Sequence, residues 1–490
     1  MLKKLLIANR GEIACRIMRT CRRLGIETVG VHHFADRAAP HVALAGEARE
    51  LAAEVPTAAY LDAAQLIAAA KEAGAEGIHP GYGFLSENAD FAARVEAAGL
   101  VFVGPQPDVI RLMGDKIRAR EFAAAHGVPV APSIEQQGDL AAFVAGAEAL
   151  GFPLLIKAAA GGGGKGMSIV RDARELATRA AIASSEAQRY FADGRIYAER
   201  YVERPRHIEV QVLGDGTGKV LHLFERECSV QRRFQKIIEE SPAARLAPDL
   251  RARICAAAVE LAAAARYRNA GTVEFILAPN GDFYFLEMNT RLQVEHPVTE
   301  LVTGLDLVEA QLRIAAGEPL RLAQSEVQAR GHAIECRICA EQPEHDFRPA
   351  TGTIRRLRVP AGEGIRFDGG IREGQAITAA FDSMLAKLVV HGSDRPAAIA
   401  RMRDALEEFV LLGVDSNGDY LGRIVDHEAF RAGDLHTGFV VEHAAALAPP
   451  PLDATDEAAV LLAAALATDE FRRLILDVPE PHAAIGAWRN

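Results

Sequence analysis

Apolar and polar residues alternate along the chain with the two periods that helices and strands produce. An apolar run at 3–8 predicts a buried strand, 13–24 carries one apolar helical face, and 26–31 predicts a second strand. A strand, a helix and a second strand in this order predict a βαβ unit and a parallel sheet. Because similar patterns follow, we expect residues 1–114 to form a doubly wound, Rossmann-like α/β domain.

Strands dominate the middle of the chain. The pattern predicts five of them, at 195–201, 207–213, 220–227, 271–277 and 283–288. We expect 115–329 to form one domain and 330–445, which mixes short strands with helix, to form a smaller α+β domain. From residue 446 the chain becomes rich in alanine and proline, so 446–490 is expected to be a linker or the start of a following domain.

Composition and charge exclude several classes of protein. The 490 residues are 49% hydrophobic and 25% charged, as in folded globular proteins, and the six cysteines are too scattered for a disulfide framework. The 55 basic against 66 acidic residues give a net charge of -11, which disfavours nucleic acid as a partner. No apolar run reaches the ~18 residues of a membrane helix. We therefore expect a cytoplasmic protein that binds neither nucleic acid nor membrane.

A glycine-rich loop, Gly161 to Gly164 followed by Lys165 and Gly166, comes soon after the predicted strand that ends at Lys157. Backbone N–H groups in such a loop can approach the phosphates of a nucleotide closely. The loop is not a Walker A motif, because Lys165 is followed by glycine rather than serine or threonine. A flexible linker is the alternative, but the position between two strands favours phosphate binding.

Glu274, Glu287 and Asn289 lie on two predicted strands joined by a short turn. Because side chains alternate along a strand, Glu287 and Asn289 share a face and Glu274 can lie opposite them. Two carboxylates and an amide oxygen are ligands that suit Mg²⁺. The alternative is the solvated outer face of a hairpin.

Immediately after these strands, Arg291, Gln293 and Glu295 alternate with apolar residues. The alternation predicts an extended segment that brings a cation, an amide and a carboxylate together. Arg291 could hold an anionic substrate while Glu295 acts as a base. The alternative is a surface ion pair without function.

Six stretches, in order over residues 1–445, resemble the biotin carboxylases of the ATP-grasp superfamily. They are Ile7 to Ala14, His79 to Asn88, Lys157 with the glycine run, Gln231 to Lys236, Glu287 to Glu300 and Gly331 to Ile338. The resemblance implies that the central domain is an ATP-grasp domain with a mobile glycine-rich lid at about 130–203. It also implies a two-stage reaction, in which ATP and bicarbonate give carboxyphosphate and ADP, and CO₂ then reaches N1 of biotin.

The same resemblance implies a role for each matching residue. ATP would be bound by Lys116, Lys157, Gly163, Gly164, Glu199, Arg200, Tyr201, Val202, His207, Glu274 and Glu287. Bicarbonate would be bound by Lys236, Arg291, Gln293 and the backbone of Val294, and Mg²⁺ or Mn²⁺ by Glu274, Glu287 and Asn289. The catalytic residues would be Lys236, Arg291, Glu295 and Arg337. Glu295 would deprotonate bicarbonate, and Arg337 would stabilise the biotin enolate.

The resemblance implies a carboxyltransferase β subunit and a biotinyl carrier domain as partners. No Met-Lys-Met attachment motif occurs in the sequence, so the biotin is expected on that carrier domain. We expect a homo-oligomer or part of a larger acyl-CoA carboxylase, of the 3-methylcrotonyl-, geranyl- or propionyl-CoA type. One departure is Phe234, where the family commonly has histidine. The alternatives are another ATP-grasp ligase, such as a carbamoyl-phosphate synthetase-like enzyme, and a nucleotide-binding scaffold without catalytic activity.

Overall fold

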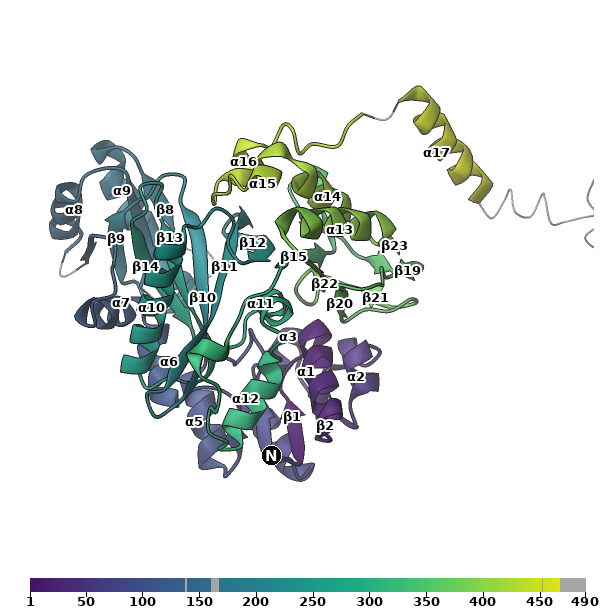
Figure 1. Cartoon of the computed structure of the whole chain (residues 1–490), viewed down its shortest axis with the longest axis horizontal. Helices are drawn as coiled ribbons and strands as arrows, with labels where there is room; N and C mark the ends of the chain where they lie inside the picture. The colour runs from purple at the N-terminus through teal and green to yellow at the C-terminus, as the bar shows by residue number, and fades with distance from the viewer. Residues whose placement is uncertain (137–138, 160–166, 452, 468–490) are drawn as a thin grey trace, which may run out of the picture. The chain divides into compact units, whose positions relative to one another are not determined.

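The computed structural model describes residues 1–136, 139–159, 167–451 and 453–467 (Figure 1). The predicted phosphate-binding residues Gly163 and Gly164 lie outside the described residues. The chain divides into two compact units, 1–447 and 448–490, and the described part of the second contains helix α17 (Ala454–Ala467). No helix within the described residues is long and apolar enough to cross a membrane.

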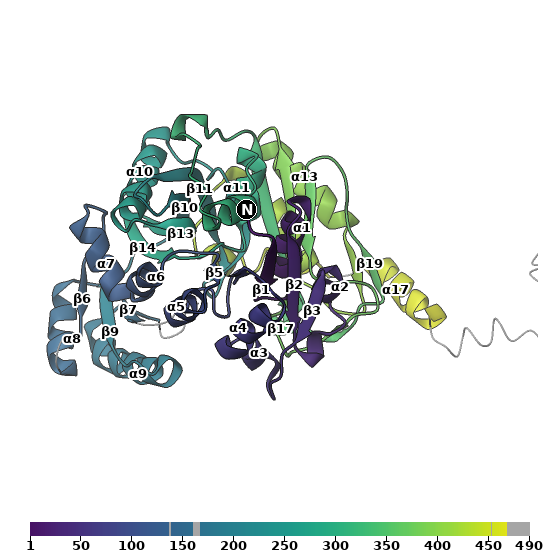
Figure 2. The same cartoon turned by 90° about the horizontal axis from the view of Figure 1, so that it is seen from below.

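The N-terminal part of the first unit contains a five-stranded parallel sheet in the order β3-β2-β1-β4-β5 (Figure 2). Its strands are β1 (Lys4–Ile7), β2 (Glu27–His32), β3 (Glu47–Glu50), β4 (Gly77–His79) and β5 (Val101–Phe102). Its main helices are α1 (Gly11–Arg23), α4 (Ala63–Glu72) and α5 (Ala89–Ala97). Leu5 and Ile7 pack with α1, whereas Leu6 packs with α4 and α5. Both faces are therefore covered, which confirms the doubly wound domain.

The largest sheet has eight antiparallel strands in the order β14-β13-β10-β11-β12-β15-β22-β20. Its strands are β10 (Arg206–Asp215), β11 (Val220–Arg232), β12 (Gln235–Ser241), β13 (Arg268–Leu277), β14 (Phe283–Asn289), β15 (His332–Cys339), β20 (Ile365–Gly369) and β22 (Met384–Gly392). Because β12 pairs with β15, this sheet continues from the predicted middle block into the predicted C-terminal block. The separate boundaries of those two blocks stay a prediction.

Two hydrophobic cores cover this sheet. Helix α10 (Pro248–Ala264) packs on β10 and β11, and its core extends to β13, where Val273 and Phe275 are fully buried. Helices α13 (Arg395–Glu408) and α14 (Gly418–Asp426) pack on β15 and β22. Because apolar residues occupy only alternate positions of β10 and β13, the other face of these strands carries polar side chains.

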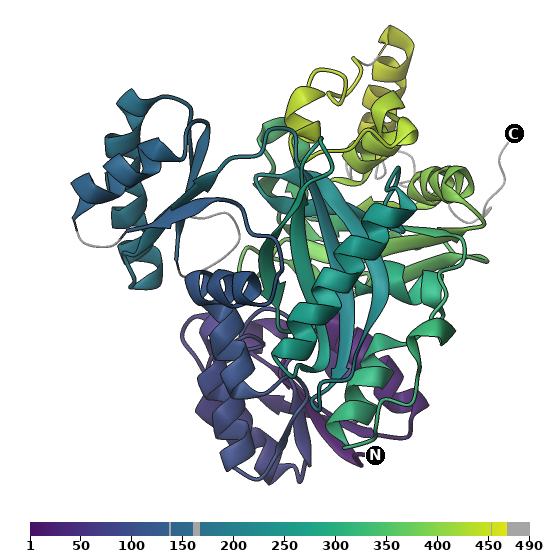
Figure 3. The same ribbon diagram turned by 60° about the vertical axis from the view of Figure 1, so that its left-hand side comes forward.

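A third sheet, with the order β6-β9-β7-β8, forms a lobe within the range predicted as a lid (Figure 3). Its elements are β6 (Ser133–Glu135), α8 (Leu140–Ala149), β7 (Leu154–Ala158), β8 (Ser168–Val170), α9 (Ala173–Phe191) and β9 (Ile196–Arg200). Helices α8 and α9 pack against this sheet. Lys157 and Glu199 therefore come from adjacent strands, β7 and β9.

The remaining elements are short. The helices are α2 (Pro40–Leu44), α3 (Pro56–Ala59), α6 (Pro107–Gly114), α7 (Lys116–Ala125), α11 (His296–Thr303), α12 (Leu307–Ala315), α15 (Glu428–Ala432) and α16 (Phe439–Glu442). The paired strands are β16 (Glu341–Gln342) with β17 (Arg348–Pro349), β18 (Gly352–Thr353) with β21 (Ala376–Ile377), and β19 (Arg356–Arg358) with β23 (Val410–Leu412).

The first prediction concerns His79 at the end of β4, which is fully buried, accepts a hydrogen bond from Gly81 N and faces Gln311. Burial lowers the pKa of His79 to about 3, although Gln311 opposes this shift. The neutral form therefore stabilises the fold above the unfolded pKa of ~6.5, and this stability is lost as pH falls. Between pH 7 and pH 5 the loss from this residue should be about 2 kcal/mol.

The His79→Gln variant should show a smaller fall in unfolding midpoint between pH 7 and pH 5 than the wild type does. The exposed His126 provides the control, and His126→Gln should retain the wild-type pH dependence. Thermal unfolding at the two pH values measures these changes. An equal fall in the unfolding midpoint in all three proteins would contradict the role given to buried His79.

Candidate active site

A cavity of about 1110 Å³ is lined by residues of the eight-stranded and four-stranded sheets and by residues that follow strands of the parallel sheet. One wall is formed by the turns after β1 and β4, the point where the strand order of the parallel sheet reverses. Asn9 joins these turns, because its Nδ2 donates to the carbonyl oxygens of Pro80 (2.7 Å) and Tyr82 (2.8 Å). Such a switch point is where open α/β sheets commonly bind ligands.

Every predicted site residue that the structure describes lines this cavity. These are Lys116, Lys157, Glu199, Arg200, Tyr201, Val202, His207, Lys236, Glu274, Glu287, Asn289, Arg291, Gln293, Val294, Glu295 and Arg337. Their convergence from strands far apart in the sequence is a structural result, but their individual roles stay predictions.

The polar face of the eight-stranded sheet forms the floor of the site. On β10, His207, Glu209 and Gln211 are buried and alternate with apolar core residues. The strand register places charged side chains in one row across β11, β10, β13 and β14, namely Arg226, Glu209, Glu274 and Glu287. Because neighbours in such a row lie about 5 Å apart, opposite charges can pair directly.

Lys236 on β12 contacts three carboxylates and with them forms a buried charged cluster. Its Nζ contacts Glu209 Oε2 at 2.5 Å, Glu274 Oε1 at 2.9 Å and Glu295 Oε1 at 2.7 Å. Burial disfavours the charge of Lys236, but the three carboxylates outweigh burial and raise its pKa well above the ordinary value. Lys236 is therefore cationic throughout the physiological pH range.

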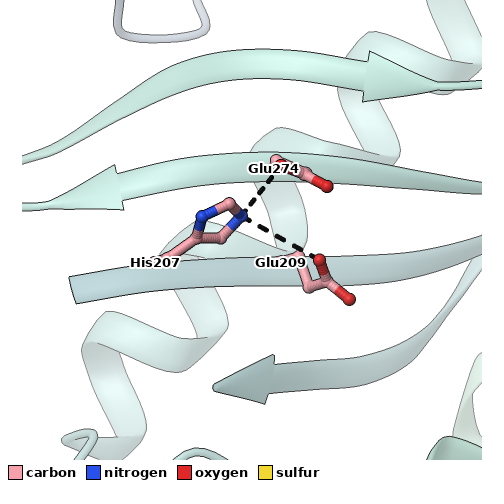
Figure 4. Close-up of side chains that lie close together, drawn as sticks. All are labelled: His207, Glu209 and Glu274. Atoms are coloured by element: carbon pink, nitrogen blue, oxygen red, sulfur yellow. Dashed lines mark ion pairs between the residues drawn. The ribbon is translucent and has the colours of Figure 1, made fainter. Parts of the chain in front are cut away.

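Glu274 accepts hydrogen bonds from several sides. His207 Nε2 lies 2.8 Å from Oε2, at ion-pair distance (Figure 4). The side-chain amides of Asn289 and Gln293 donate to Oε1 at 2.7 Å each. Burial would raise the pKa of Glu274, but Lys236 and His207 hold it well below its ordinary value. The carboxylate is therefore ionised and available to a cation.

The predicted metal ligands fit a hard divalent cation by their donor chemistry. Glu274 and Glu287 are directly opposite on β13 and β14, and Asn289 follows on the face of Glu287. Glu287 Oε2 also lies 3.2 Å from the Nζ of Lys116, a predicted phosphate-binding residue. Carboxylate and amide oxygens next to a phosphate site are the usual ligands of Mg²⁺.

The predicted extended conformation of 291–295 is wrong in its second half. Residues 294 and 295 form a turn, and Glu295 (φ −80°, ψ 7°) is the residue from which α11 begins. Arg291 reaches back, with Nε 3.0 Å from Glu87 Oε2. The fully buried Lys387 donates to the carbonyl oxygen of Val294 at 2.9 Å. A helix start after Val294, which the alternating pattern does not reveal, places the Glu295 carboxylate in the cluster.

Glu295 is shared between two cations. Its Oε1 contacts Lys236, and its Oε2 lies 3.0 Å from Nη2 of Arg337 on β15. Burial would raise the pKa of Glu295, but Lys236 and Arg337 outweigh burial and hold the pKa well below its ordinary value. Glu295 is thus an ionised carboxylate that accepts from Lys236 on β12 and from Arg337 on β15.

A second cluster of charged side chains lies at the four-stranded lobe. Lys157 forms an ion pair with Glu199, and Arg120 Nη1 contacts the other oxygen of Glu199 at 3.0 Å. Burial lowers the pKa of Lys157, although Glu199 opposes this shift. The next residue, Arg200, points away and donates to the carbonyl oxygen of Leu150 at 2.8 Å. Only its backbone is therefore positioned to serve a ligand there.

The sequence did not point to Glu209, Arg226, Glu239 or Arg120, which form ion pairs with one another or with predicted site residues. Arg226 is fully buried and donates to Glu209, Gln211, Thr299, Thr272 and Gln293. For Glu209 a signal existed, because it continues the polar alternation that begins at His207. Phe234, the departure from the family pattern, is half-exposed at the turn between β11 and β12, with a positive φ of 65°.

Family models match three consecutive parts of the chain. Residues 1–110 match the biotin carboxylase N-terminal domain, 115–323 the ATP-binding domain of the carbamoyl-phosphate synthase L chain, and 335–442 the biotin carboxylase C-terminal domain. A pyruvate carboxylase subunit of Methanothermobacter thermautotrophicus is 49% identical over 446 residues, which cover 90% of each chain.

Other relatives differ in length. The methylcrotonoyl-CoA carboxylase alpha subunit of Glycine max is 49% identical over 90% of this chain, but the match spans 60% of that relative. Among solved structures, the biotin carboxylase domain of Hydrogenobacter thermophilus 2-oxoglutarate carboxylase is 45% identical with a TM-score of 0.89, covering 92% of this chain and 100% of that one. That structure is a dimer in complex with MgADP, ADP and bicarbonate.

The second prediction tests the buried charge cluster through Arg226→Met. Removing one partner of a buried ion pair typically costs about 3–5 kcal/mol, because it leaves the other charge uncompensated. The control is Arg313→Met on α12, where an exposed arginine pairs with Glu309 and Glu318 and should contribute about 1 kcal/mol or less. Denaturation of both variants checks this, and equal losses of stability would contradict it.

Proposed function

The chain belongs to the biotin carboxylase family, and on this basis we propose that it carboxylates biotin with ATP and bicarbonate. The supporting observation is that Glu295 is ionised and held between Lys236 and Arg337. These are a predicted bicarbonate ligand and the predicted biotin ligand, so one carboxylate adjoins both stages of the reaction.

In the first stage, ATP lies between the lobe and the eight-stranded sheet. Lys157 and Lys116 bind its phosphates, and the backbone from Glu199 to Val202 binds adenine. Glu274, Glu287 and Asn289 hold Mg²⁺ or Mn²⁺, which neutralises charge on the transferring phosphoryl group. The ion pair between Lys116 and Glu287 brings these two sets of ligands together.

Bicarbonate binds between Lys236, Arg291, Gln293 and the backbone of Val294. Two cations beside the anion favour its deprotonated form, which allows the weak base Glu295 to accept the proton. The deprotonated oxygen attacks the γ-phosphorus, the bond to ADP breaks, and carboxyphosphate forms. Lys236 stays charged because three carboxylates surround it.

In the second stage, carboxyphosphate releases CO₂ and phosphate. The phosphate accepts the N1 proton of biotin, and the guanidinium of Arg337 stabilises the negative charge on the ureido oxygen. N1 then attacks CO₂ to give carboxybiotin. The carbamoyl-phosphate synthetase-like alternative is less well supported, because the family models on both sides of the ATP-binding domain are those of biotin carboxylases.

The proposed partners are a biotinyl carrier domain and a carboxyltransferase β subunit, together with self-association. Relatives support a carboxylase assembly but differ in substrate, since they include pyruvate and methylcrotonoyl-CoA carboxylase subunits. An acyl-CoA carboxylase α subunit is our proposal among these. The cytoplasmic location stays a prediction, because the relatives include mitochondrial proteins.

The third prediction tests the base. Glu295→Gln should lower bicarbonate- and biotin-dependent ADP release by about 10²–10⁴-fold, as loss of a general base does. Asp382→Asn alters an exposed carboxylate at the cavity rim and should stay within about twofold of the wild type. Release of ADP with and without free biotin measures both. A wild type without biotin-stimulated turnover, or a fully active Glu295→Gln protein, would overturn the proposal.

The fourth prediction tests the metal site. Glu287→Gln removes one charged oxygen donor and should raise the Mg²⁺ concentration for half-maximal activity by at least about tenfold. Chelation with EDTA should stop turnover in the wild type, and added Mg²⁺ should restore it. An unchanged Mg²⁺ dependence in the variant would exclude Glu287 as a ligand.

A further inference from the structure

Arg337 is bound by two carboxylates that come from different kinds of element. Its Nε lies 2.6 Å and its Nη2 2.5 Å from Glu239 Oε1, while Nη2 also lies 3.0 Å from Glu295 Oε2. Glu239 is fully buried on strand β12, whereas Glu295 ends an irregular loop. The guanidinium of Arg337 thus pairs both with Glu239 on the sheet and with Glu295, the proposed base.

The β-sheet register determines where Glu239 lies. Glu239 is directly opposite Glu335 on β15, and Arg337 follows two residues later on the same face. A side chain from the middle of a paired strand is held more rigidly than one from a loop. The carboxylate of Glu239 therefore holds the guanidinium of Arg337 in a fixed position.

Glu335 occupies an equivalent place but makes no comparable contact. It is fully buried, and neither of its carboxylate oxygens has a hydrogen-bond partner among the described residues. Burial, together with Glu239 and Glu295, raises its pKa well above the ordinary value in spite of Lys387 and Arg337. Burial therefore favours the neutral form of Glu335, and Arg337 pairs with Glu239 instead.

We propose that Glu239 is the positioning residue for Arg337 and that Glu335 has no such role. This inference rests on the proposed function. When Glu295 accepts the proton of bicarbonate, it loses its charge and its attraction for Nη2 of Arg337. The contacts of Nε and Nη2 to Glu239 persist, so the guanidinium stays beside the cavity and its remaining N–H groups can donate to the ureido oxygen of biotin.

Without Glu239, the guanidinium would pair with Glu295 alone. This pairing would make Glu295 a weaker base and would draw Arg337 away from biotin. The nucleotide ligands Lys157 and Glu199 lie on another sheet and would be unaffected. The loss should therefore fall on bicarbonate deprotonation and on carboxylation of biotin, and leave MgATP binding unchanged.

The experiment compares Glu239→Ala, Glu239→Gln and the matched control Glu335→Gln, assayed at pH 8 with free biotin. Burial raises the pKa of Glu239 to about 7 despite the opposing effect of Arg337, so Glu239 is ionised at this pH. We expect Glu239→Ala to lower kcat/KM for biotin at least tenfold and to change KM for MgATP less than twofold. Glu239→Gln, which keeps an acceptor oxygen, should lose less, and Glu335→Gln should match the wild type.

Two results would overturn the inference. One is equal behaviour of Glu239→Ala and Glu335→Gln, and the other is an unchanged kcat/KM for biotin in Glu239→Ala once activity is normalised to the folded fraction of the protein. If Glu239→Ala does not fold, the isosteric Glu239→Gln carries the same comparison. A wild type without biotin-dependent turnover would refute the proposed function instead.

Crystal structures of the variants give a readout without turnover. The guanidinium of Arg337 should move towards Glu295 in Glu239→Ala and keep its position in Glu335→Gln. An unmoved guanidinium in Glu239→Ala would show that other contacts orient Arg337.

Discussion

The site depends on one constraint: an ionised side chain that leaves water must find an opposite charge or several hydrogen bonds. Lys236, Arg226 and Arg337 meet this requirement together with Glu209 and Glu295 on one buried face. Lys236, Arg337, Glu209 and Glu295 each form at least two ion pairs, and Arg226 supplements its ion pair with Glu209 by hydrogen bonds to four neutral side chains. Each charge therefore fixes the position of the next, and the cluster is rigid before any substrate enters.

Cross-strand register supplies this arrangement. Because paired residues on neighbouring strands lie about 5 Å apart, the row from Arg226 through Glu209 to Glu274 follows from backbone pairing alone. The sheet also continues through β12 and β15, which brings Arg337 next to the same cluster. A separate middle domain would leave the proposed base without its second cation.

Preorganisation of this kind suits a reaction in which charge moves between sites. Substrate anions can replace carboxylates around Lys236, and the cations need not move far to meet them. The lobe that carries Lys157 and Glu199 has its own sheet and core, so these two proposed nucleotide ligands belong to a different sheet from the residues around the proposed base.

Sequence alone determined the α/β class, the five strands predicted for the middle block and the predicted site residues that line the cavity. Periodicity and local motifs are properties of neighbouring residues, and motifs such as 287–300 keep their ligands close together in the chain. The partners of those ligands were not visible, because Arg226 and Glu239 resemble ordinary charged strand residues until register places them. The start of α11 at His296 also escaped the alternating pattern. Only tertiary structure decided which charges meet, since contacts between distant strands depend on pairing that no local pattern encodes.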